Sequence, residues 1–194
     1  MRAIGGATAT LTAGVVVMTL AGCGGGPAGR THNGHAYHGG NADHAGPAGH
    51  GVVLGDPNAV PAAEVPNAEL VGGEFRVLDT APEGYQNVKG FAQLARHAGG
   101  ITVTVELAGL KPRTEIIAHV HEGSCAEGGG QHYRFDPQGA DVPPNEIHLL
   151  VTSDESGAGR MTVENKRRAG AAARSIVVHP VEFQDNRITC APLS

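Results

Sequence analysis

The stretch "GITVTVELAGL" (residues 100–110) decides the fold class of this chain. Its apolar residues occupy every second position and alternate with polar ones: Ile101, Val103, Val105 and Leu107 against Thr102, Thr104 and Glu106. Successive side chains of a β-strand point to opposite faces. The alternation therefore predicts a strand with one apolar face and one face in water.

Short runs of the same kind follow along the chain. "TEIIAHVHE" (114–122) alternates in the same way, "HLLVTSDESGAGRMTVEN" (148–165) indicates two strands joined by a turn, and "RSIVVHP" (174–180) indicates a strand that Pro180 ends. "GFAQLARHAGG" (90–100) is too short and too glycine-bounded to favour a helix. Repeated short strands favour an all-β antiparallel sandwich or barrel, which we expect to occupy residues 67–194 as one domain.

The N-terminal residues 1–22 have the pattern of an export signal, since Arg2 precedes an uncharged, mostly apolar or small stretch that ends in "LAGC". This ending resembles a bacterial lipoprotein signal, in which Cys23 is lipidated and becomes the new N-terminus. An ordinary secretory signal with an incidental cysteine is the alternative. No later segment approaches the ~20 apolar residues of a membrane span. We therefore expect a soluble domain outside the cytoplasm, lipid-anchored to a bacterial membrane.

Residues 23–66 are rich in Gly, Ala, Pro, His and Asn and have few large apolar residues, which predicts a flexible tether. Five of the 11 histidines lie in it: His32, His35, His38, His44 and His50. Flexible histidine-rich tracts can bind copper, zinc or nickel. The alternative is a solvated spacer that lifts the domain off the membrane.

Charge bears on the class of binding partner, and cysteine content bears on disulfide formation. The net charge of -5 and the lack of a basic run exclude a nucleic-acid partner. Once Cys23 is assigned to the lipid, Cys125 and Cys190 are the only intramolecular pair. An oxidising compartment predicts that they form a disulfide, worth ~4 kcal/mol in the chain-entropy model, rather than two buried free thiols.

The alternation in residues 114–122 also has a chemical consequence, because it places His119 and His121 on the same face of a strand. At ~3.3 Å per residue the two imidazoles stand roughly 7 Å apart, which suits two ligands of one metal ion. His132 follows a Gly-rich loop and His179 ends another strand. Together they predict a metal site with imidazole ligands, which copper and zinc both accept.

Four motifs then resemble the copper/zinc superoxide dismutases in the order of that family: "HVHEGSC" (119–125), "QHYRFDPQG" (131–139), "VVHP" (177–180) and "RITCAPL" (187–193). The resemblance covers residues 88–194 and implies a Greek-key β-barrel of about eight antiparallel strands. It implies copper ligation by His119, His121, His132 and His179, with His132 at the bridging position. It also implies that Cys125 pairs with Cys190 and that Arg187 guides the substrate anion.

Two departures from the family point to its copper-only branch. Where the family has further zinc ligands, "PQGADVPPNEIHLL" (137–150) offers only His148 with Asp141 and Glu146, so a complete zinc site is not expected. A weak site using Asp141 and His148 stays open. Only ten residues (180–189) separate His179 from Cys190, where the family has a long charged loop over the active-site channel. The copper is therefore expected to be open to solvent. Without zinc, another group must orient His132, and Glu146 or Asp141 is the expected partner.

The resemblance predicts a copper-dependent superoxide dismutase that converts superoxide to dioxygen and hydrogen peroxide outside the cytoplasm. Arg187 and His132 are its expected catalytic residues. The alternative is a copper-binding or copper-buffering lipoprotein with little catalysis. Arg187 favours the enzyme, because metal buffering needs no guide for anions.

Overall fold

The computed structural model describes residues 54–194, so the predicted signal peptide, Cys23 and the five tether histidines lie outside the described residues. This part of the chain forms nine strands and two short 3-10 helices, η1 (Ala62–Glu64) and η2 (Cys125–Glu127). The strands are β1 (Glu69–Glu74), β2 (Arg76–Val77), β3 (Lys89–His97), β4 (Gly100–Ala108), β5 (Glu115–His121), β6 (His148–Thr152), β7 (Gly159–Asn165), β8 (Ser175–Pro180) and β9 (Thr189–Pro192). Within residues 54–194 no helix is long and apolar enough to cross a membrane.

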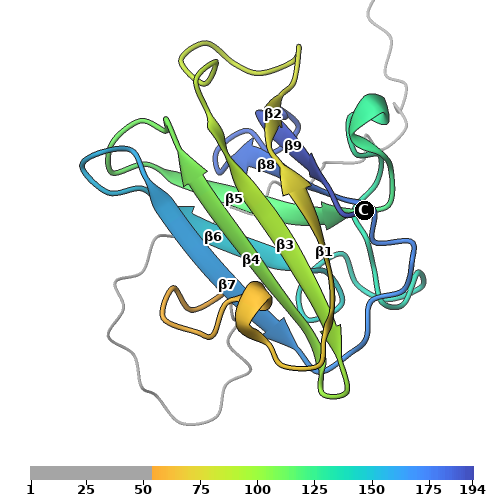
Figure 1. The fold of residues 1–194 in the computed structure, drawn as a ribbon. Coiled ribbons are helices and arrows are strands. Elements are labelled where there is room, and N and C mark those ends of the chain that lie inside the picture. The colour runs from red at the N-terminus through yellow and green to blue at the C-terminus, as the bar shows by residue number, and fades with distance from the viewer. Residues whose placement is uncertain (1–53) are drawn as a thin grey trace, which may run out of the picture. The chain divides into compact units, whose positions relative to one another are not determined.

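The strands form two antiparallel sheets, in the orders β1-β3-β4-β7 and β2-β9-β8-β5-β6 (Figure 1). The predicted all-β antiparallel sandwich is therefore confirmed. Phe75 alone separates β1 from β2, so one bent strand passes from the first sheet to the second. Counted in this way there are eight strands. The chain leaves the first sheet after β4, returns as β7 beside β4, and crosses again to β8 beside β5, which is a Greek-key order.

Strand β5 has the two faces that its sequence predicts. Ile116, Ala118 and Val120 belong to the hydrophobic core between the sheets. His119 and His121 consequently lie on the outer face of the five-stranded sheet. Residues 90–100, which we did not expect to form a helix, contribute most of strand β3.

The turn predicted at residues 154–159 is present, but the strands on either side of it do not pair with each other. β6 is the edge of the five-stranded sheet, whereas β7 is the edge of the four-stranded sheet. Residues 54–56 span the two edges: the Leu54 carbonyl accepts a hydrogen bond from Leu150 N of β6 (3.0 Å), and Asp56 N donates to the Thr162 carbonyl of β7 (2.7 Å). Residues that the composition groups with the tether therefore pack on the sandwich.

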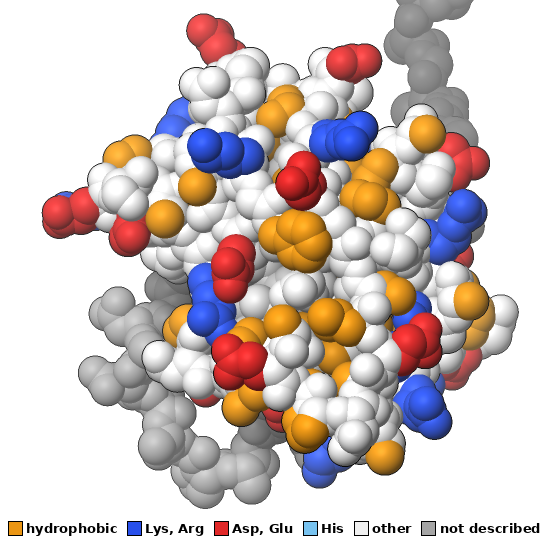
Figure 2. All heavy atoms as spheres, viewed as in Figure 1, with side chains coloured by type: hydrophobic (Ala, Val, Ile, Leu, Met, Phe, Trp, Pro, Cys, Tyr) orange, Lys and Arg blue, Asp and Glu red, His pale blue; other side chains and the backbone are white. Residues whose placement is uncertain are grey.

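One prediction, that the polar face of strand β4 lies in water, is wrong for two of its residues. Thr102 and Thr104 of β4, expected in water, are 1% and 2% exposed. Thr104 Oγ1 accepts a hydrogen bond from Ala62 N of η1 (2.9 Å) and lies 2.9 Å from Thr162 Oγ1 of β7. The alternation is right, but a segment from earlier in the chain covers the polar face. Figure 2 shows this side of the molecule, where charged side chains are scattered among hydrophobic ones.

Candidate metal centre

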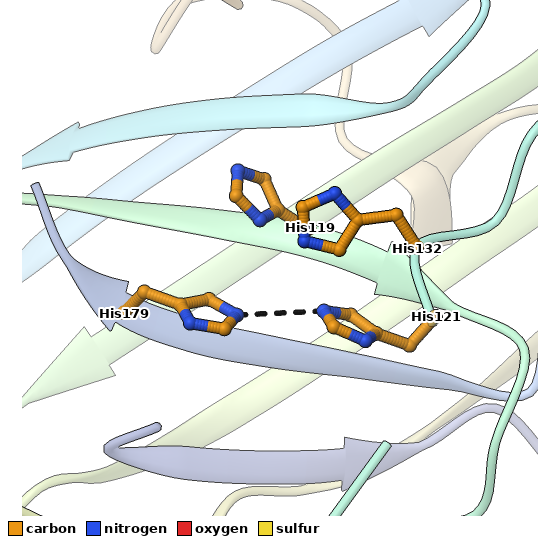
Figure 3. Close-up of side chains that lie close together, drawn as sticks. All are labelled: His119, His121, His132 and His179. Carbon is orange, nitrogen blue, oxygen red and sulfur yellow. Dashed lines mark hydrogen bonds between the residues drawn. The ribbon is translucent and has the colours of Figure 1, made fainter. Parts of the chain in front are cut away.

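Strands β5 and β8 and one loop bring the four predicted histidines together (Figure 3). His119 and His121 come from β5, and His179 comes from β8, which pairs with β5 in the same sheet. His132 follows the Gly-rich loop, and its backbone forms an isolated bridge with His121. One ligand nitrogen from each ring can be chosen so that all four lie within 4.8 Å of one another. The fold thus gathers four imidazoles from three separate parts of the sequence.

Hydrogen bonds at Nδ1 fix the rings of His121 and His179. His121 Nδ1 donates to the Gly130 carbonyl (3.2 Å), and His179 Nδ1 donates to the Asn186 carbonyl (3.0 Å). Because a carbonyl only accepts, each ring carries its proton on Nδ1 and keeps a lone pair on Nε2. The two Nε2 atoms face each other at 3.4 Å, as the dashed line in Figure 3 marks. Two facing lone pairs repel unless a cation lies between them.

His119 gives the strongest local sign of a metal site. The residue is 1% exposed, and neither of its ring nitrogens has a hydrogen-bond partner among the described residues. Its ring centroid lies 4.2 Å from that of His132. A buried polar group without a partner costs about 1–3 kcal/mol, which coordination of a metal would remove. The donor set therefore fits a metal ion.

Burial keeps these rings uncharged. Desolvation is the main cause that lowers the pKa of His121 to about 3 and that of His179 to about 4, and the proximity of His132 lowers both further. Burial, followed by the neighbouring His148 and the other rings, lowers the pKa of His119 well below its ordinary value. Neutral imidazole is the form that binds metals. The three rings are therefore in the ligating form at neutral pH.

Glu146 occupies the position behind His132. Its Oε2 accepts hydrogen bonds from His132 Nδ1 (2.8 Å) and His148 Nε2 (2.7 Å). Burial alone would raise the pKa of Glu146, but these two hydrogen bonds outweigh it and lower the pKa to about 2. The ionised carboxylate thus fixes the ring of His132 with Nε2 directed to the cluster. Of the two partners expected for His132, Glu146 makes the contact, whereas Asp141 pairs with Arg134 (2.6 Å).

His148 lies with His132 and Glu146 and not with Asp141. It is 4% exposed, and its ring centroid lies 4.2 Å from that of His119. The ligand atoms of His132, Glu146 and His148 also lie within 4.8 Å of one another. The weak site that the sequence left open for Asp141 and His148 is therefore not formed by that pair.

Arg187 lies beside the histidines. Its guanidinium donates to the carbonyl of Gly130 (2.8 Å) and to that of Gly128. The loop that carries these carbonyls follows Cys125, and a disulfide joins Cys125 to Cys190, three residues after Arg187. The Gly130 carbonyl also accepts the hydrogen bond from His121. One oxygen atom thus orients both a candidate metal ligand and the arginine.

The Gly-rich loop requires its glycines. Gly128, Gly129 and Gly130 have φ angles of 69°, 96° and 68°, in the left-handed region that favours glycine. A Cβ atom on Gly129 would lie 2.4 Å from Val177 Cγ2 and 3.3 Å from the ring of His121. Only glycine lets the loop pass so close to the outer face of the sheet.

A polar hollow of about 360 Å³ opens over the histidines. Its lining includes His132, His179, Arg187 and Arg134, together with the acidic residues Asp141, Glu146 and Asp185. Sequence reasoning missed Arg134. The available signal was its position two residues after His132, because side chains two apart in an extended segment share a face.

Comparison with known proteins finds a similarity in structure but none in sequence. No protein-family model matches the chain, and no curated protein matches it. Among solved structures, a Cu/Zn superoxide dismutase from Brucella abortus is similar, with 20% sequence identity and a TM-score of 0.44. The match covers 66% of this chain and 99% of that chain.

Proposed function

We propose that this chain is a copper-dependent superoxide dismutase that acts outside the cytoplasm. The observation that carries the proposal is the buried group of four imidazoles, in which both His119 nitrogens have no partner in the described residues and the Nε2 atoms of His121 and His179 face each other. The hollow over them is polar and is bordered by Arg187. The four motifs described above support the same function.

The nature of the reaction selects the metal. Imidazole ligands suit copper and zinc alike, but only copper changes oxidation state. Bound copper would supply one-electron chemistry, so that one superoxide is oxidised to dioxygen and a second, with two protons, is reduced to hydrogen peroxide. The chain would hold the metal through His119, His121, His132 and His179.

Arg187 would attract and orient the anion. The chain has a net charge of -5, so a local positive potential is needed to draw superoxide to the site. The guanidinium is held by two carbonyls, and within residues 54–194 it forms no direct salt bridge with a carboxylate.

We assign proton transfer to His132 Nε2, which can carry a proton only while it does not hold the metal. His132 lines the hollow, and its side chain is 33% exposed, whereas His119, His121 and His179 are buried. Glu146 holds the opposite nitrogen, Nδ1, so the ring keeps its orientation whether or not Nε2 carries a proton. Solvent in the hollow would supply that proton, and the superoxide that is reduced would take it up as part of hydrogen peroxide.

The cellular setting is part of the proposal. The Cys125–Cys190 disulfide is typical of proteins in oxidising compartments. We propose lipidation at Cys23, anchoring to the bacterial cell envelope, and metal binding by the histidines of the tether, all on the sequence patterns alone.

The test uses protein without residues 1–53, so that the tether histidines do not contribute to copper counts. After reconstitution with copper alone, copper content and superoxide dismutation are measured on the same sample. About one copper per chain with rapid turnover supports the proposal. One copper with negligible turnover would favour the copper-buffering alternative, and no copper retained would contradict both.

A further inference from the structure

We infer that Arg134 is a second anion-binding residue of the hollow and that Asp141 limits its effect. This inference rests on the copper site of the proposed function and deepens it, since it concerns how an anion reaches that site. It assigns a role to an ion pair that the proposed reaction does not otherwise use.

The backbone places Arg134 on the same side as His132. The segment is extended: His132 bridges to His121, and Arg134 bridges to Glu146. Because the two residues are separated by one position, their side chains share a face. Arg134 consequently lines the same hollow as His132 and Arg187.

The two arginines of the hollow differ in their partners. Arg187 donates only to carbonyls, whereas Arg134 Nη1 donates to Asp141 Oδ1 at 2.6 Å, with a longer contact to the Gly139 carbonyl at 3.5 Å. The Asp141 side chain is 76% exposed and that of Arg134 is 33% exposed. Exposed ion pairs of this kind contribute about 0–1 kcal/mol to stability. The main effect of Asp141 is therefore on the charge that an entering anion meets.

The balance of charge in the hollow makes this effect large enough to measure. Apart from its histidines, its lining carries two positive residues, Arg134 and Arg187, and three negative ones, Asp141, Glu146 and Asp185. Glu146 is buried and bound to two histidines, so its role is fixed. Neutralising Asp141 would release the charge of Arg134, and neutralising Arg134 would leave an uncompensated carboxylate at the entrance.

The inference is tested by azide binding to the copper-loaded protein that lacks residues 1–53. Binding is measured from the azide-to-copper absorption band, at low and at high salt. Azide is a small monovalent anion, and its binding is read without any turnover. At low salt we expect Asp141→Asn to bind azide about threefold more tightly and Arg134→Gln about threefold more weakly than the unsubstituted protein. Both differences should shrink at high salt.

A second ion pair supplies matched controls. Arg113 and Glu155 pair with side chains 76% and 81% exposed, beyond the start of β5 and outside the hollow. Arg113→Gln and Glu155→Gln change the net charge by the same amounts as the two test substitutions. We expect both to leave azide affinity unchanged, which separates a local effect from one of total charge.

Each outcome has a distinct meaning. Opposite shifts for Asp141→Asn and Arg134→Gln support the inference, even if superoxide turnover is absent and the proposed function fails. Equal azide affinities in all variants would overturn the inference and leave the proposed function standing. Weaker binding in both test variants would show that the pair only holds its loop, which also overturns it. A protein that retains no copper would overturn both proposals.

Discussion

The outer faces of both sheets carry buried polar side chains, yet these side chains differ in one respect. On the four-stranded sheet, Thr104 and Thr162 bond to each other, and Thr104 also accepts from Ala62 N. On the five-stranded sheet, His119 has no hydrogen-bond partner in the described residues, and the free nitrogens of His121 and His179 face each other.

This difference separates a structural polar face from a ligand site. Buried polar groups in proteins are nearly always paired, so a face that satisfies itself needs nothing further. Where several buried acceptor atoms lie together without donors, they gain a partner only when a ligand such as a metal ion binds. The comparison predicts that changes to the histidine face affect metal binding and that changes to the threonine face affect only stability.

The largest effect is expected from His121→Ala. Loss of a group that only orients a metal ligand costs a metal site about 10- to 100-fold in affinity, so loss of a ligand itself should lower copper affinity by more than ~100-fold and abolish dismutation. Chelator competition and a dismutation assay measure the two effects. Thr162→Val, on the other outer face, is the control and should keep both. Full copper affinity in His121→Ala would contradict the assignment of the site.

Acid should destabilise the metal-free protein through the histidine face. The pKa values of His121 and His179 in the folded state, about 3 and about 4, lie below the ordinary value of 6.5. Between these values the unfolded chain binds more protons than the folded one, so stability falls as pH falls below 6.5. Glu146, lowered from 4.5 to about 2, acts in the same direction below pH 4.5. We expect a loss on the order of 2 kcal/mol from pH 7 to pH 5 in urea unfolding.

A matched pair of variants checks the origin of that loss. Thr104→Val should keep the pH dependence, because it removes no titrating group. His179→Ala should reduce the dependence. A metal-free protein equally stable at pH 7 and pH 5 would show that the histidines are not held uncharged.

Glu146→Gln should weaken the site without removing a predicted ligand. The amide keeps the shape of the side chain but loses the charge that holds His132 and His148 by hydrogen bonds. We expect copper affinity to fall about 10- to 100-fold, measured by chelator competition. Glu155→Gln, which neutralises an exposed carboxylate, is the control. An unchanged affinity would mean that His132 does not depend on Glu146 for its orientation.

The smallest effect is expected on the threonine face. Thr104→Val removes the acceptor of Ala62 N and the partner of Thr162, which should cost about 1–2 kcal/mol in the free energy of unfolding. Copper affinity should not change. A variant that loses copper would break the comparison, because the two faces would then be coupled.

The sequence predicted much of the histidine face because local rules govern it. A period of two places His119 and His121 together and assigns Ile116, Ala118 and Val120 to the core. Pairing of β5 with β8 then brings His179 within reach, and no local pattern in the sequence predicts that pairing.

Features that depend on distant parts of the chain could not be predicted in the same way. Thr104 is buried where a segment some forty positions earlier contacts it, and no property of strand β4 predicts that contact. Proximity in sequence offered two partners for His132, and only the folded loop distinguishes Glu146 from Asp141.

The shared carbonyl of Gly130 has a consequence for the maturation of the protein. It orients His121 and Arg187 together, and the disulfide fastens its loop to the strand that follows Arg187. A newly made, reduced chain would have its strands but would lack the covalent hold on that loop. The arginine and the histidine would then take up their final positions together, once the disulfide has formed.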